Sequence, residues 1–214
     1  MSVLDQSKSY FKYFEEITKI PHGSYNEKAL ADYIENFAKV RGLQYKRDEM
    51  DNVIVYKEAT PGYEDHAPVM LQGHIDMVNE KNNDSDHDFD KDPLDLYIED
   101  GWLHARGTTL GADDGVAVAY MLAILDDKEL RHPALECVFT TAEEAGCVFT
   151  VQEEVGLFGA ANIKKEDIRA RRMINMDSGG ETHTSVSSSG GRRSIVSKPY
   201  RMQDNTLMTY QLDI

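Results

Sequence analysis

The sequence predicts an α/β fold with a mixed, mainly parallel sheet flanked by helices. Short apolar runs typical of strands alternate with longer segments whose apolar residues follow the 3.6-residue helical period. Hydrophobic residues make up 41% and charged residues 29% of the 214 residues, which is typical of a globular chain and argues against general disorder. At roughly 150 residues per domain, this length corresponds to about 1.4 domains.

Three segments have the pattern of helices. Residues 6–19 carry apolar side chains at helical spacing and stop before Pro21, which cannot continue a helix. Residues 24–27, Ser-Tyr-Asn-Glu, form the pattern of a capping box that opens a second helix, and Gly42 ends it. Residues 116–126 are largely apolar, which predicts a buried helix.

Short apolar or alternating runs predict the strands. They lie at 43–47, 53–57, 67–72, 134–140 and 173–176. Two further runs, 94–98 and 102–105, flank an Asp-Gly pair that signals a hairpin. Binding and catalytic residues of such sheets gather at the carboxyl ends of strands, so we expect the functional site there.

The charge and the termini exclude several classes of function. The 38 Asp and Glu residues against 23 Lys and Arg give a net charge of −15, which argues against nucleic acid or an anionic membrane as partner. The N-terminus lacks the apolar core of a secretory signal, and the longest apolar stretch is about half a membrane span. Two cysteines, Cys137 and Cys147, make no disulfide framework, so we expect a cytoplasmic location.

Four strand or helix ends carry side chains that bind divalent cations. Each has an ordinary explanation alone: a buried histidine with a carboxylate partner, a helix N-terminus, or a solvated acidic pair. Together they form the nitrogen and oxygen ligand set that zinc, manganese or cobalt accepts, and the surplus of carboxylates suits a two-metal hydrolytic site. The residues are His74 with Asp76, Asp113 with Asp114, Glu153 with Glu154, and Asp177.

The order of these motifs resembles one family. The motifs are Gly-His-Ile-Asp-Met at 73–77, Arg-Gly-Thr-Thr-Leu-Gly-Ala-Asp-Asp-Gly at 106–115, Thr-x-x-Glu-Glu-x-Gly, and Asn-x-Asp-Ser at 175–178. They resemble the di-zinc metallopeptidases related to carboxypeptidase G and the cytosolic dipeptidases, from about residue 8 to the C-terminus. The resemblance implies a three-layer zinc-peptidase catalytic domain. It also implies hydrolysis of dipeptides, of the Xaa-His type or of broad specificity, by a zinc-activated water.

The resemblance further implies a role for each residue. His74, Asp113 and Asp177 are the implied ligands of one zinc, with Asp113 bridging to a second zinc that Glu154 also binds. Asp76 orients His74, and Glu153 is the general base that deprotonates the water and passes the proton to the leaving amine. Cobalt or manganese is an alternative to zinc.

A near-repeat leaves the identity of the acidic pair open. Residues 137–146 (CVFTTAEEAG) and 147–156 (CVFTVQEEVG) are identical at seven of ten positions. The upstream flank fits the first copy and the downstream flank fits the second, so one pair fills the site. We favour Glu153 and Glu154, because the second copy leads directly to the following helix and to Asp177; Glu143 and Glu144 are the alternative. A ten-residue insertion beside a strand also predicts weaker metal binding or lower stability.

The chain is expected to cover only part of such an enzyme. Members of the family have a second domain that closes over the substrate and often dimerises, and a C-terminal return that supplies a last histidine. We therefore expect residues 1–181 to be the N-terminal part of the catalytic domain, incomplete at its C-terminus, and 182–214 to begin the lid domain. A homodimer is an option for the full-length member.

The incomplete ligand set of the second zinc affects the expected activity. It predicts that one metal binds better than two and that dipeptide hydrolysis is impaired. An N-acyl amino acid deacylase and an inactive metal-binding fragment are the alternative functions.

Overall fold

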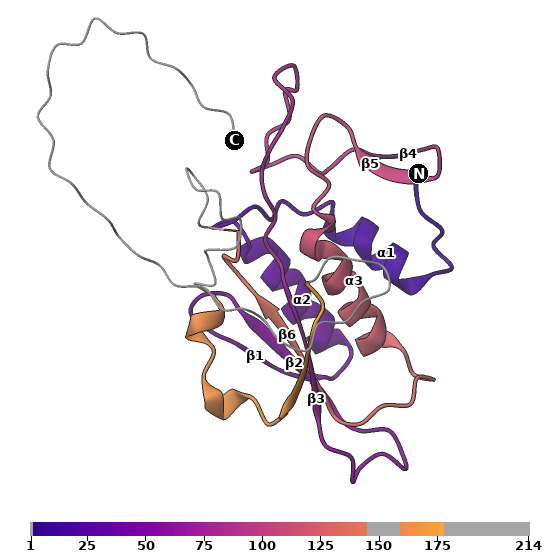
Figure 1. Ribbon diagram of the computed structural model, residues 1–214, viewed down its shortest axis with the longest axis vertical. Helices are drawn as coiled ribbons and strands as arrows, with labels where there is room; N and C mark the ends of the chain where they lie inside the picture. The colour runs from indigo at the N-terminus through magenta and orange to yellow at the C-terminus, as the bar shows by residue number, and fades with distance from the viewer. Residues whose placement is uncertain (1, 145–158, 178–214) are drawn as a thin grey trace, which may run out of the picture. The chain divides into compact units, whose positions relative to one another are not determined.

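The computed structural model describes residues 2–144 and 159–177, which belong to one unit of the chain (Figure 1). Its α-helices are α1 (Ser9–Ile17), α2 (Lys28–Val40) and α3 (Ala112–Asp126). Its strands are β1 (Gln44–Arg47), β2 (Val53–Lys57), β3 (Val69–His74), β4 (Leu96–Glu99), β5 (Trp102–Ala105), β6 (Leu135–Thr140) and β7 (Arg172–Asn175). Two 3₁₀ helices, η1 (Ala160–Asn162) and η2 (Lys165–Asp167), precede β7. The expected lid segment, 182–214, lies outside the described residues.

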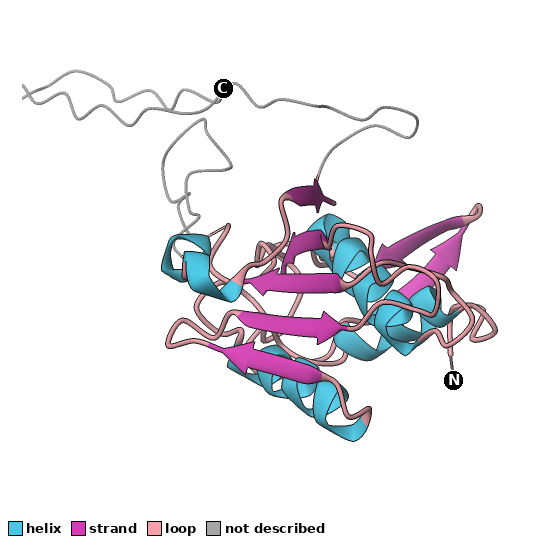
Figure 2. Cartoon of the chain, turned by 90° about the horizontal axis from the view of Figure 1, so that it is seen from below, coloured by secondary structure: helices cyan, strands magenta, loops and turns pink. Residues whose placement is uncertain are grey.

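Five strands form a mixed sheet in the order β1-β2-β6-β3-β7 (Figure 2). Strand β6 pairs antiparallel with β2 and parallel with β3, and β3 pairs parallel with β7. Strands β1 and β2 are antiparallel, and β4 and β5 form the separate hairpin that the Asp-Gly pair predicts. The mixed sheet expected from the sequence is confirmed, with its parallel part in β6, β3 and β7.

One hydrophobic core joins the helices to the sheet. Alternate residues of β2 and β6, among them Val55 and Phe139, are fully buried together with side chains of α1, α2 and α3. Tyr13 of α1 packs edge-on against Phe37 of α2, with ring centroids 5.5 Å apart. Each fully buried large apolar side chain contributes about 1.5–3 kcal/mol, so this cluster holds the helices on the sheet.

The predicted helices and strands all occur within a few residues of their expected positions, but the predicted capping box is wrong. Helix α2 begins at Lys28 and has no side-chain cap. The Ser24 hydroxyl instead donates a hydrogen bond to the Asp76 carboxylate, 2.8 Å away. Helix α3 is assigned from Ala112, but Asp113 and Asp114 have non-helical backbone angles, so the regular helix follows the acidic pair, close to its predicted start at residue 116.

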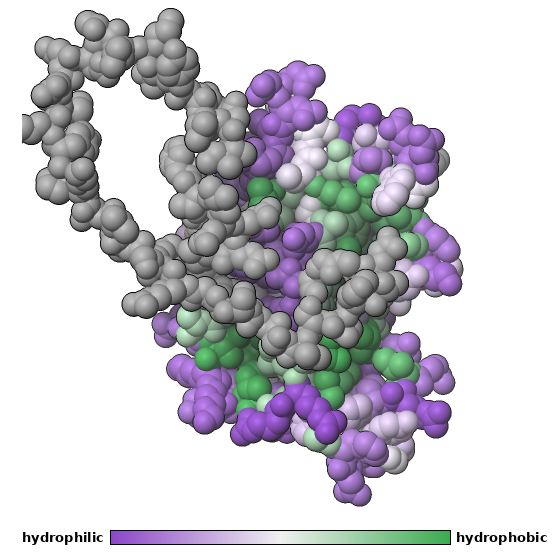
Figure 3. Space-filling view, in the orientation of Figure 1, coloured by the Kyte–Doolittle hydropathy of each residue, from purple (hydrophilic) through white to green (hydrophobic). Residues whose placement is uncertain are grey.

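Hydrophilic residues cover much of the visible face, with smaller apolar patches between them (Figure 3). Among the described residues, no helix is long and apolar enough to cross a membrane.

Candidate metal centre

The carboxyl ends of β3 and β6 meet at one edge of the sheet. The strands run parallel, and His74, the last residue of β3, pairs with Thr140, the last residue of β6. The residues that follow the two strands therefore emerge side by side. Asp113, near the start of α3, reaches the same place, with its Oδ1 3.1 Å from the Nε2 of His74.

His74 is held in an orientation that suits a metal ligand. Its side chain is 1% exposed, and its Nδ1 lies 2.9 Å from the backbone carbonyl of Asp76. A carbonyl oxygen only accepts, so Nδ1 donates and Nε2 is the atom that faces Asp113. Burial lowers the pKa of His74, but the hydrogen bond and charge of Asp76, with the charges of Asp114 and Glu143, outweigh it and raise the pKa to about 10.

The Asp76 carboxylate organises the turn that follows β6. Its Oδ1 accepts the backbone N–H of Glu143 at 3.1 Å, and its Oδ2 accepts the backbone N–H of Glu144 at 3.0 Å. The same carboxylate lies 3.4 Å from the His74 Nδ1 and is 0% exposed. Asp76 therefore fixes both the imidazole and the acidic turn. Burial alone would raise the pKa of Asp76, but the hydrogen bonds from His74, Ser24 and the Glu143 N–H, with the charge of His74, outweigh it and lower the pKa.

The adjacent acids at the start of α3 have different surroundings. The Asp113 side chain is 73% exposed and faces the His74 Nε2. Asp114 is 4% exposed, and its Oδ2 accepts the backbone N–H of His74 at 3.2 Å. Burial raises the pKa of Asp114 to about 7, with further repulsion from Asp177 and Asp113. Asp113 is thus available to a ligand, whereas Asp114 holds the end of β3.

Two overlapping sets of side chains can hold a cation. His74, Asp113 and Asp177 each present a ligand atom within 4.8 Å of the others, and so do His74, Glu143 and Glu144. One imidazole nitrogen with carboxylate oxygens is a donor set that suits zinc and related divalent ions. Three carboxylates around His74 are buried, those of Asp76, Asp114 and Glu143. Burial of several carboxylates together is unfavourable unless positive charge offsets it, and a bound cation would supply such charge. The residues present therefore fit a divalent metal.

Glu143 has the properties of a general base. Its side chain is 9% exposed, and its Oε2 lies 4.0 Å from the Nε2 of His74. Burial, with repulsion from Glu144, Asp177 and Asp76, raises the pKa of Glu143 to about 7 against the opposing charge of His74. A general base works best when its pKa lies near the operating pH.

The structure brings together most of the residues that the sequence singled out. His74, Asp76, Asp113 and Asp177 converge, and the acidic pair beside them is the alternative one, Glu143 and Glu144. The favoured pair, Glu153 and Glu154, lies outside the described residues.

Three residues that contact the site were given another role or no separate role by the sequence analysis: Ser24 and Glu27 as a helix cap, and Asp114 only as the neighbour of Asp113. In the sequence, these residues form only an acidic pair and a capping-box pattern. A helix N-terminus explains the first pattern and a helix cap explains the second, so neither indicates a metal centre.

Comparison with known proteins assigns the family. Residues 70–191, more than half of the chain, match the model of the peptidase family M20/M25/M40. The chain belongs to this family. The family is one of metallopeptidases, so membership supports divalent metal binding at this centre. Within the M20/M25/M40 family, the chain is 43% identical over 178 residues to the cytosol non-specific dipeptidase of Escherichia coli strain K12. That alignment covers 83% of this chain and 35% of the relative.

Solved structures support the same family fold. The aminoacylhistidine dipeptidase of Vibrio alginolyticus is 41% identical with a TM-score of 0.73, and the match covers 81% of this chain and 33% of that one. A tripeptidase of Staphylococcus aureus, 22% identical with a TM-score of 0.64, shares the fold; the match covers 84% of this chain and 45% of that one. The chain therefore spans about a third of the length of its two more similar relatives.

Proposed function

We propose that this chain is the N-terminal catalytic part of a zinc-dependent dipeptidase. The observation that carries the proposal is the convergence of His74, Asp113 and Asp177 within 4.8 Å, beside the buried carboxylate of Glu143. Residues 1–181 belong to the catalytic domain in this proposal, and 182–214 begin a lid domain.

Each residue of the centre has a role in the proposed reaction. His74, Asp113 and Asp177 would hold one zinc, and Glu144 and Asp113 would contribute to a second. When bound, zinc would supply a Lewis acid that polarises the peptide carbonyl and lowers the pKa of water. Glu143 takes the proton of the attacking water and delivers it to the leaving amine, because its raised pKa permits both steps near neutral pH. Asp76 keeps the His74 Nε2 directed at the metal.

The proposed substrates are dipeptides, of the Xaa-His type or of broad specificity. The names of the two more similar relatives, a non-specific dipeptidase and an aminoacylhistidine dipeptidase, support this choice. The first name also refers to the cytosol, which supports a cytoplasmic location, and a homodimer is proposed for the full-length protein.

Hydrolysis of Xaa-His dipeptides by the purified chain tests the proposal. Removal of metal with EDTA should abolish turnover, and added Zn²⁺ should restore it. Glu143→Gln should lower kcat at least about 100-fold. Glu153→Gln, a change in a nearly identical sequence, is the matched control and should leave kcat unchanged.

Other outcomes would contradict the proposal. Turnover that survives chelation or Glu143→Gln would contradict the metal and base assignments. Faster hydrolysis of N-acyl amino acids would indicate a deacylase, and metal binding without hydrolysis of either substrate would indicate an inactive metal-binding fragment.

A further inference from the structure

The segment that precedes helix α2 contacts both strand ends of the metal centre. At one end, the Ser24 hydroxyl donates a 2.8 Å hydrogen bond to Oδ2 of Asp76, after β3. At the other, Oε1 of Glu27 accepts the backbone N–H of Ala142 at 3.0 Å, after β6. We propose that Ser24 and Glu27 are positioning residues, which fix the distance between His74 and the Glu143-Glu144 turn and thereby set metal affinity. This inference rests on the proposed function for its metal.

Burial makes these two hydrogen bonds specific. Asp76 is 1% exposed and Ala142 is 2% exposed, so water does not readily replace either contact. Glu27 itself is 6% exposed. Ala142 has a positive φ of 54°, an uncommon conformation for a residue with a side chain, and it immediately precedes Glu143. The Glu27 hydrogen bond thus holds the backbone in the conformation that places Oε2 of Glu143 4.0 Å from Nε2 of His74.

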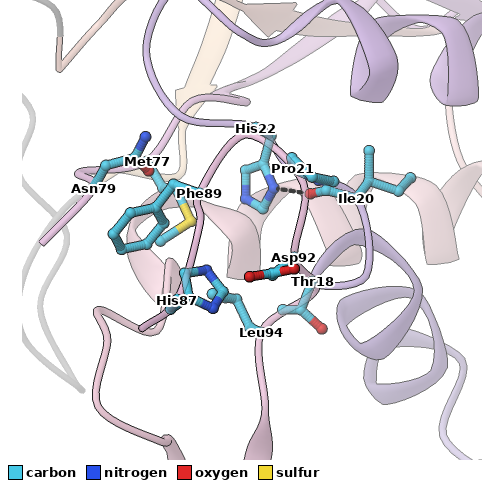
Figure 4. A pocket seen from close by; sticks show the side chains of 10 residues that line it. All are labelled: Thr18, Ile20, Pro21, His22, Met77, Asn79, His87, Phe89, Asp92 and Leu94. Atoms are coloured by element: carbon cyan, nitrogen blue, oxygen red, sulfur yellow. Dashed lines mark hydrogen bonds between the residues drawn. The ribbon is translucent and has the colours of Figure 1, made fainter. Parts of the chain in front are cut away.

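The segment is anchored independently at its start (Figure 4). The His22 ring is buried, and its Nδ1 donates to the carbonyl of Ile20 at 2.6 Å. The carbonyl of His22 in turn accepts the backbone N–H of Met77 at 3.2 Å, and Gly23 forms an isolated bridge with Met77. Met77 follows Asp76 directly, so this anchoring places the Ser24 hydroxyl against the carboxylate.

The contacts of Ser24 and Glu27 with the metal centre explain why the predicted capping box of α2 does not form. Ser24 and Glu27 would satisfy backbone N–H groups of α2 if they capped it, yet α2 has no side-chain cap. Both side chains instead satisfy groups of the metal centre. A local rule that fails at a functional site is the expected signature of residues selected for that site.

Two measurements on single variants test the inference. The first is amide hydrogen exchange at Ala142, Glu143 and Glu144, followed by NMR in the presence of EDTA. Ser24→Ala and Glu27→Ala should each speed exchange at these amides about 10-fold, because a buried hydrogen bond is lost. The second is Co²⁺ affinity, followed by the visible absorption of the bound ion, which should weaken about 10-fold.

Conservative and control variants separate positioning from stability. Ser24→Thr keeps the hydroxyl, and Glu27→Gln keeps an oxygen acceptor, so both should retain exchange and affinity near the unmodified values. Ser9→Ala and Glu49→Ala alter exposed residues and should change neither.

Failure of the positioning role and failure of the proposed function give different experimental results. Unchanged exchange at Ala142–Glu144 in both alanine variants, or equal losses in the conservative variants, would overturn the positioning role. An unmodified chain that binds no Co²⁺ would refute the proposed function, while faster exchange in the alanine variants would still support the positioning role.

Discussion

Removing one copy or the other of the tandem repeat tests which copy belongs in β6. Deletion of residues 137–146 and deletion of residues 147–156 yield chains of equal length. The two shortened chains differ at only three positions. Deletion of 137–146 leaves Val, Gln and Val there, whereas deletion of 147–156 leaves Thr, Ala and Ala. The second deletion keeps Thr141 and Ala142 in their observed surroundings, whereas the first replaces them with Val151 and Gln152.

The surroundings of these two positions give the magnitude. Thr141 is 2% exposed, and its hydroxyl donates a 2.7 Å hydrogen bond to the backbone carbonyl of Met50. Valine cannot form this bond, which costs about 1 kcal/mol. Ala142 is also 2% exposed, so glutamine there must bury a polar amide, which costs about 1–3 kcal/mol. The deletion of 137–146 should therefore be less stable by about 2–4 kcal/mol.

Urea unfolding in the presence of EDTA measures this difference without a contribution from bound metal. The two midpoints should differ while the slopes agree, because both chains expose similar surface on unfolding. Equal free energies of unfolding, or a more stable chain after deletion of 137–146, would refute the assignment of the first copy to β6.

Three further substitutions test separate parts of the structure. Asp76→Asn should weaken Zn²⁺ affinity about 10- to 100-fold in a competition titration, because its amide group would oppose one of the two backbone N–H donors; unchanged affinity would contradict this. Gly159→Ala would place a Cβ 2.1 Å from the Thr141 carbonyl oxygen, so urea unfolding should show a loss of about 1–3 kcal/mol; no loss would show that the contact is absent. The Arg41 hydrogen bond lowers the pKa of Asp126 below 3.8, so its contribution to stability is present above about pH 4 and is lost as the pH falls through the folded-state value. The melting temperature of Asp126→Asn should therefore fall less steeply on acidification than that of the unmodified chain, and parallel curves would refute the linkage.

The elements of the fold could be predicted because periodicity reflects burial directly. Strand β6 is buried at every position, and its sequence is apolar apart from Glu136 and the last residue, Thr140. That carboxylate is fully buried because it accepts the backbone N–H groups of Arg169 and Ala170, a contact that no local pattern reveals. Local signals thus located the strand, and only the tertiary structure explains its charged residue.

The site could be predicted only in part. The residue types at the strand ends indicated a metal, and His74, Asp113 and Asp177 converge as the pattern suggests. The choice between the two acidic pairs could not be made from the sequence, since the copies are identical at all the residues with metal-binding side chains. The side chain of Thr141 differs between the copies: its hydroxyl donates to the backbone carbonyl of Met50, far away in the chain, and Val151 of the second copy has no hydroxyl.

The most direct test of the metal centre is an anomalous X-ray map from crystals of the chain soaked with Zn²⁺. Our account predicts a peak about 2.0–2.2 Å from Nε2 of His74 and from carboxylate oxygens of Asp113 and Asp177, with Glu143 beside it. A peak bound to other residues, or no peak at this end of β3 under saturating Zn²⁺, would contradict it.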